Sequence, residues 1–107
     1  MSRARSNLDA AIIAELKGRV ASLRAQAYED LALLAEADTD HATIQGKLVT
    51  FTVFRERQPD GTLLVLVRSD RPIFFGIGTK GTTEGFYALP SGEKRDAYGD
   101  EISEFFA

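Results

Sequence analysis

The chain has 107 residues, of which 44% are hydrophobic and 27% are charged, and its formal net charge at pH 7 is −3. This length supports one domain with its own core, and no apolar stretch approaches the roughly 20 residues that a membrane span requires. Because the chain contains no cysteine, disulfides, thiolate metal sites and cysteine nucleophiles are excluded. The first residues lack the apolar region of a secretory signal, so we expect a cytoplasmic protein.

The charged side chains are grouped in blocks along the chain. Residues 29–46 contain five acidic and no basic side chains, and residues 96–107 contain four acidic and no basic ones. Nucleic-acid binding depends on lysine and arginine side chains that neutralise phosphates, so these acidic blocks argue against it. Such a block is typical either of a solvated face or of a surface that attracts a basic protein partner.

Apolar residues recur three or four positions apart early in the chain, which predicts an amphipathic helix over residues 8–36 after a flexible N-terminus at residues 1–7. The apolar stripe consists of Leu8, Ile12, Leu16, Val20, Leu23, Ala27, Leu31 and Leu34. We expect Ser6 or Asn7 to cap the start of the helix. A straight helix of this length would measure about 40 Å. We therefore expect the helix to bend or split near Gly18 or to overhang the domain, and we expect a homodimer formed through this helix.

From Thr43 onward apolar residues tend to occupy every second position, which predicts an antiparallel sheet over residues 43–99. The expected strands are "LVTFTVFRER", "TLLVLVRS", "IFFGIGT" and "GFYALP", with a fifth after "SGEKRDAY". Turns are expected at "QPDGT" and "SDRP", and a mobile hairpin loop at "TKGTTEG". Residues 100–107 are expected to form a short helical turn capped by Asp100. The predicted fold class is α+β, with a long N-terminal helix packed on a curled antiparallel meander of four or five strands.

The stretch "GIGTKG" at residues 76–81 has the glycine spacing of a dinucleotide-binding loop. Such a loop requires a helix that starts at its last glycine, whereas "TTEGFYALP" follows here and does not favour a helix. We therefore predict no cofactor. Gly76 and Gly78 lie two positions apart on one face of the predicted strand, where they favour either a sharp curl of the sheet or a groove for a small ligand.

The other candidate sites are weaker. The stretch "DTDH" at residues 38–41 groups two acids with the only histidine, but adjacent loop residues seldom complete a coordination shell. We expect a solvated loop that ends the helix, and no metal. No serine stands in a nucleophile-elbow setting, so no catalytic residue is assigned. Aromatic side chains of the sheet are expected in the core rather than stacked on RNA bases, because the RNA-binding motif is missing; they are Phe74, Phe75, Phe86 and Tyr87.

Three functions remain open on the sequence. The first is a small acidic, non-enzymatic protein-binding or inhibitory domain that occupies a partner's surface. Its partner-binding residues would be Asp96, Asp100, Glu101, Glu104 and Phe105. The second is a pocket for a small ligand, or a carboxylate-dependent enzyme, with its site between the helix and the curled sheet. The third is a structural dimerisation module built on the N-terminal helix.

Overall fold

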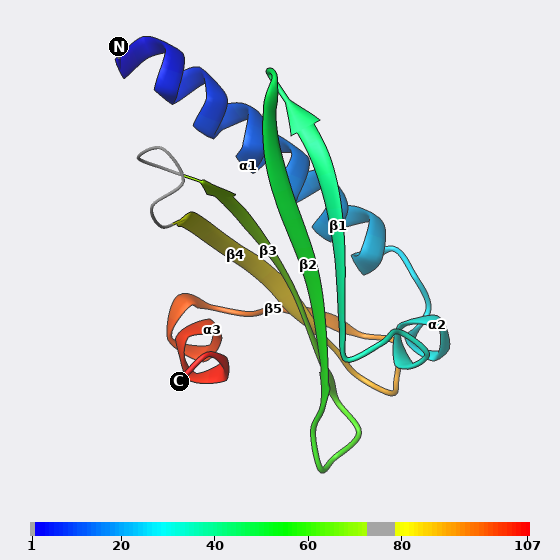
Figure 1. Cartoon of the computed structure of the whole chain (residues 1–107). Coiled ribbons are helices and arrows are strands. Elements are labelled where there is room, and N and C mark those ends of the chain that lie inside the picture. The colour runs from blue at the N-terminus through cyan, green and yellow to red at the C-terminus, as the bar shows by residue number, and fades with distance from the viewer. Residues whose placement is uncertain (1, 73–78) are drawn as a thin grey trace.

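The structure is a computed structural model that describes residues 2–72 and 79–107. One long helix packs on one face of a five-stranded antiparallel sheet, and a short C-terminal helix packs on the other face (Figure 1). The elements are α1 (Ser2–Arg24), α2 (Tyr28–Ala32), β1 (Ala37–Ile44), β2 (Lys47–Arg57), β3 (Leu63–Pro72), β4 (Thr79–Ala88), β5 (Lys94–Asp96) and α3 (Gly99–Phe105). Each strand pairs with the next one along the chain, which confirms the predicted α+β fold class.

The core has two sides because alternate residues of the central strands point to opposite faces. Toward α1, Leu8, Ile12 and Leu16 pack with residues of β2 and β3, namely Val49, Phe51 and Val67. A neighbouring cluster on the same face joins Leu31 to Leu63, Val65, Phe86 and Ala88. On the opposite face, Leu64, Leu66 and Tyr87 pack against α3. Strand β3 is thus covered on both faces, which explains why its sequence is apolar at almost every position.

The N-terminal helix differs from its prediction at both ends. It begins at Ser2, so Ser6 and Asn7 lie inside the helix and not at its cap. It ends at Arg24, so the predicted helix is interrupted at residues 25–27 and not at Gly18. Ala27 is extended there, with ψ of 153°. No helix-breaking residue occurs at this interruption. The turn instead places Leu31 of α2 against the sheet, where its side chain is fully buried.

The apolar stripe of α1 does not overhang the sheet over the part whose side chains are described. Leu8 is 9% exposed, Ile12 is 5% exposed and Leu16 is fully buried, all within one chain. Val20 and Leu23 also pack against the core. The predicted homodimer stays a prediction, but an exposed apolar stripe no longer supports it.

The first strand was not predicted. Residues 38–41 were expected to be a solvated loop, but β1 pairs with β2 over its full length, from Ala37 opposite Phe54 to Ile44 opposite Lys47. A two-residue turn joins the strands, and both of its residues have positive φ, 51° at Gln45 and 77° at Gly46. Such turns match the twist of paired strands and fix their register. The turn therefore favours pairing of β1 with β2, although β1 has few apolar residues.

Two expected loops are also parts of strands. "SDRP" lies inside β3, and all of "TKGTTEG" lies inside β4, since Ser69 pairs with Thr82 and Pro72 with Thr79. The predicted turn at "QPDGT" is confirmed, with φ of 89° at Gly61. The predicted strand "IFFGIGT" lies outside the described residues except for its last threonine. Among the helices of the described ranges, none is long and apolar enough to cross a membrane.

Candidate functional site

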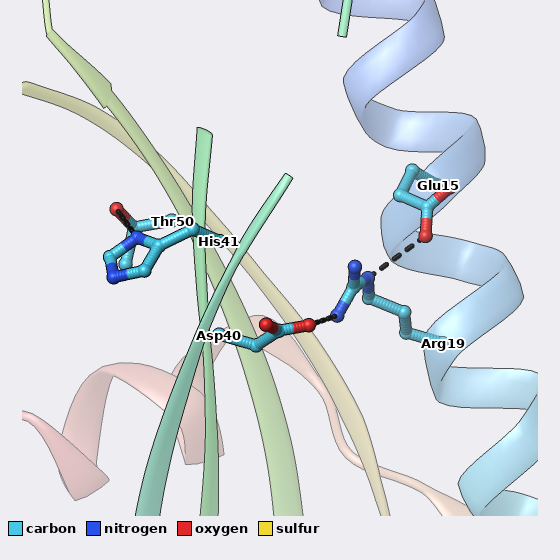
Figure 2. A network of polar contacts seen from close by, with 5 residues as sticks. All are labelled: Glu15, Arg19, Asp40, His41 and Thr50. Atoms are coloured by element: carbon cyan, nitrogen blue, oxygen red, sulfur yellow. Dashed lines mark hydrogen bonds and ion pairs between the residues drawn. The ribbon is translucent and has the colours of Figure 1, made fainter. Parts of the chain in front are cut away.

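Strand β1 forms one edge of the sheet and carries two acidic side chains on the face toward α1. Figure 2 shows how Arg19 of α1 reaches one of them: its guanidinium donates to Asp40 Oδ2 at 3.2 Å and to Glu15 Oε2 at 2.9 Å. The same guanidinium lies 4.1 Å from the centroid of the Phe51 ring, where a cation is attracted to the ring face. Arg19 therefore ties the middle of α1 to the edge strand.

The local contacts keep Asp40 ionised. The backbone N–H of His41 and then the side chain of Arg19 hold the pKa of Asp40 below the ordinary value of 3.8. Both groups favour the charged carboxylate because they donate hydrogen bonds to it. Strand β1 consequently keeps this negative charge at neutral pH.

The acids of "DTDH" and its histidine do not face the same way. Asp40 points toward α1, whereas His41 points to the opposite face, where its Nδ1 lies 3.3 Å from Thr50 Oγ1 (Figure 2). Because side chains alternate along a strand, Asp38 and Asp40 cannot join His41 in one coordination sphere. Over residues 2–72 and 79–107, no group of three or more metal-ligating side chains is close enough to hold an ion.

The outer edge of β1 presents unpaired backbone groups. The amide of Arg55 donates to the carbonyl of Glu36 at 3.0 Å, so this opposed pair is a hydrogen-bonded one. Hydrogen-bonded and non-hydrogen-bonded pairs alternate along an antiparallel ladder. The even-numbered residues of β1 therefore form the backbone hydrogen bonds to β2. The backbone N–H and C=O groups of Ala37, Thr39, His41 and Thr43 therefore point away from the sheet. The N–H of His41 is not unpaired, because it contacts the carboxylate of Asp40.

No other described segment of the chain forms backbone hydrogen bonds with the outer edge of β1. The sheet order ends at β1, and no hydrogen bond between backbone groups joins its outer side to another described segment. Unpaired strand edges are sites where another chain can add a strand. The side chains of the outward residues are themselves mostly exposed.

The five residues predicted to bind a partner do not form one surface. Asp96 is paired with Arg24 of α1. Glu101 accepts hydrogen bonds from the Tyr87 hydroxyl at 2.9 Å and from the Tyr98 amide at 3.0 Å. Phe105 packs against Phe54, with ring centroids 5.5 Å apart. Asp96 thus ties β5 to α1, whereas Glu101 and Phe105 hold the C-terminal segment to the sheet. The two residues that remain, Asp100 and Glu104, are exposed on α3.

The N-cap residue of α3 is Tyr98, not Asp100, and Glu101 completes a capping box with it. The carboxylate of Glu101 accepts from the Tyr98 amide just before the helix, which satisfies a donor that the helix leaves unpaired. The hydrogen bonds from the Tyr98 amide and the Tyr87 hydroxyl lower the pKa of Glu101 below 4.5. Burial and this same contact raise the pKa of Tyr87 above 10.0. The ionised carboxylate thus anchors α3 to β4.

The glycine-rich stretch divides between the described and undescribed parts of the chain. Gly76 and Gly78, the predicted ligand groove, lie outside the described residues. Gly81 lies inside β4, opposite Asp70, where a dinucleotide-binding loop would require the start of a helix. Of the four aromatic residues predicted in the core, Phe86 and Tyr87 are buried, and Phe74 and Phe75 lie outside the described residues.

Comparison of the chain with protein-family models, with curated proteins and with solved structures found no match. The functional argument therefore depends on the chain's own residues.

Proposed function

We propose that this chain is a small acidic, non-enzymatic protein-binding domain, and that its edge strand β1 pairs with an extended basic segment of the partner. The observation that carries the proposal is the free backbone edge of an eight-residue strand. A partner segment that adds a sixth strand gains main-chain hydrogen bonds along that edge, and its side chains then determine specificity.

The charge of the surrounding chain supports a basic partner. No lysine or arginine occurs between residues 25 and 46, whereas five acids do: Glu29, Asp30, Glu36, Asp38 and Asp40. All five residues are exposed. Complementary charge accelerates association and discriminates against acidic partners.

The same charge argues against a second copy of this chain at the edge. Two β1 strands paired antiparallel would bring the acids of one copy beside those of the other. Like charges opposed across a strand pair are destabilising. A basic segment of another protein therefore fits β1 better than another copy of β1 does.

The experiment compares two substitutions of one outward-pointing residue. Proline at position 39 removes the outward N–H of Thr39 and places a ring on the free edge, while leaving the bonds to β2 intact. Thr39→Ala removes the side-chain hydroxyl and keeps the N–H. The probe is a peptide of about eight residues that alternates lysine and valine, a length that matches the strand. Binding is followed by NMR titration.

We expect Thr39→Pro to weaken probe binding by about tenfold, which corresponds to roughly 1.4 kcal/mol, and Thr39→Ala to change it by less than about twofold. Equal binding by the proline variant, with its fold verified by circular dichroism, would contradict edge pairing. Charge is tested by Asp38→Lys, with Asp100→Lys as the matched control on α3. Only Asp38→Lys should slow association with the probe, and the difference should shrink as salt is added.

A further inference from the structure

A small hollow lies between α1 and the ends of β3 and β4, away from the edge strand. Its volume is about 40 Å³, and its lining residues are Asp9, Ile12, Ile13, Ser69, Arg71, Lys80 and Thr82. None of them belongs to β1, so this site is independent of the proposed protein-binding edge. A space of about 10–15 Å³ holds one water molecule, so the hollow has room for about three waters or for a carboxylate head group.

The hollow contains two cations and one anion. Arg71 Nη2 lies 2.8 Å from Asp9 Oδ1, and Lys80 Nζ lies 3.0 Å from Asp9 Oδ2. Each oxygen of the single carboxylate is thus used by one cation. Among the lining residues that the structure describes, the sum of formal charges is +1, because Asp9 is the only acid of that set.

The neighbouring cations keep the carboxyl group of Asp9 ionised. The hydrogen bond from Lys80, followed by the contacts with Arg71, lowers the pKa of Asp9 below 3.8, although burial opposes the shift. Asp9 is therefore ionised at neutral pH and cancels one of the two positive charges. The other positive charge has no acidic partner among the described residues that line the hollow.

Arg71 has donors left for a second anion. Its side chain is only 13% exposed, and a guanidinium carries five N–H groups in a planar fork, of which one bonds Asp9. Lys80, which also lines the hollow, is half exposed. The planar fork of arginine matches the two oxygens of a carboxylate, and the partly buried setting strengthens the attraction.

The hollow also has an apolar wall. Ile12 is buried and Ile13 is 37% exposed, and both line the space beside the cations. A ligand with a short aliphatic group next to its charge can cover Ile13. One unbalanced positive charge matches a carboxylate monoanion better than a phosphate dianion.

We propose that this hollow binds the carboxylate of a small aliphatic acid or of a peptide C-terminus, held by Arg71 and Lys80 with its aliphatic part against Ile13. Asp9 occupies the same two cations, so it competes with the ligand and keeps the affinity low. Removing the Asp9 charge should therefore tighten binding, which a purely structural ion pair does not predict.

The first experiment titrates the folded chain with butyrate and, as an uncharged control of the same shape, with butyramide, at constant ionic strength. Binding is followed by NMR signals of Arg71 and Lys80. We expect butyrate to shift these signals saturably and butyramide to leave them unchanged. Equal effects of the two probes, or no shift at about 100 mM butyrate, a concentration that detects even millimolar affinity, would overturn the proposal.

Three variants locate the site. Lys80→Gln should weaken butyrate binding by roughly tenfold, the value of one charge-assisted hydrogen bond, and Asp9→Asn should strengthen it severalfold. Lys17→Gln is the matched control, because Lys17 pairs with Glu84 between the same helix and β4 but does not line the hollow. Unchanged affinity in Lys80→Gln, or weaker binding in Asp9→Asn while its unfolding midpoint is preserved, would contradict the assignment.

A second pair of probes distinguishes the sources of the carboxylate. An alanyl-valine dipeptide with a free C-terminus is compared with its C-terminal amide. Tighter binding of the free dipeptide than of butyrate assigns the site to a chain terminus, and tighter binding of butyrate assigns it to a small acid. Equal binding of the dipeptide and its amide would contradict carboxylate recognition.

Discussion

Gly85 of β4 provides the sharpest test of the sheet. It pairs with Leu66, and a methyl group added at its Cα would lie 2.1 Å from the carbonyl oxygen of Val65 and 2.6 Å from Leu66 Cδ2. A backbone oxygen cannot turn aside as a side chain does. Gly85→Ala must therefore push β4 away from β3, by about 1 Å if ordinary contact distances are to be restored.

The cost follows from what that movement breaks. Overpacking a well-packed core costs about 1–3 kcal/mol, and each ladder hydrogen bond stretched beyond its normal range loses about 0.5–1.5 kcal/mol. We expect the free energy of unfolding of Gly85→Ala to fall by about 3 kcal/mol. For a domain of this size the melting temperature falls by about 4–8 °C per kcal/mol, hence by more than about 10 °C. Urea and thermal unfolding measure both quantities.

Two other glycines supply matched controls. Alanine at position 81, on the same face of β4, would meet Arg68 Nη2 and Asp70 Oδ1 at 2.7 Å, but these are the ends of flexible side chains, so we expect a cost below about 1 kcal/mol. At Gly18 no atom lies within 4 Å, and alanine in a helix interior should stabilise the chain by about 0.5–1 kcal/mol. If Gly85→Ala were as stable as Gly81→Ala, the pairing of β3 with β4 would be wrong.

Three further substitutions test other contacts. Leu31→Ala should lower the free energy of unfolding by about 2–5 kcal/mol, because Leu31 is fully buried, whereas Leu33→Ala, at a site 84% exposed, should change it by less than about 0.5 kcal/mol in urea titrations. Tyr28→Phe removes the hydroxyl that donates to the Gly61 carbonyl and should cost about 1 kcal/mol in the same titrations; no loss would show that this bond does not stabilise the turn. The pKa of Glu101 is lowered on folding, so its stabilising effect is complete above 4.5 and disappears as the pH falls through the lower folded value. Stability measured against pH should therefore fall less steeply in acid for Glu101→Gln than for the parent chain, and identical slopes would contradict the anchoring role.

The apolar pattern predicted the centre of the fold. The stripe on α1 and the alternation in β2 both reflect burial against one face, as Leu16, Val49 and Phe51 show. The uninterrupted apolar run of β3 reflects burial on two faces. These elements were predictable because each one's local pattern records the face that it buries.

Strand β1 was not predictable in this way because its residues bury little. The acids on its inner face are tolerated through contacts distant in the chain, such as the pairing of Asp40 with Arg19. The available signal was the "QG" turn before "LVTFTVFRER", since a two-residue turn with positive φ implies a preceding strand of similar length. Without that strand, neither the sheet order nor its free edge could be derived.

The C-terminal acids show why the sequence alone could not locate a functional site. Composition reveals the sign of a charged block, but not which charges are already paired within the chain. Arg24 neutralises Asp96, and Tyr87 binds Glu101, each across a long stretch of sequence. Charge patterning therefore indicated a basic partner without locating the surface that binds it.

Hydrogen exchange of the β1 amides, measured by NMR with and without the lysine–valine probe peptide, tests the central claim most directly. If the peptide adds a strand at this edge, the outward amides of Thr39 and Thr43 should become protected. The amides of Asp38, Asp40 and Ala42, already bonded to β2, should change little. Protection confined to other elements, or unchanged exchange along β1 at saturating peptide, would contradict the proposal that this edge binds the partner.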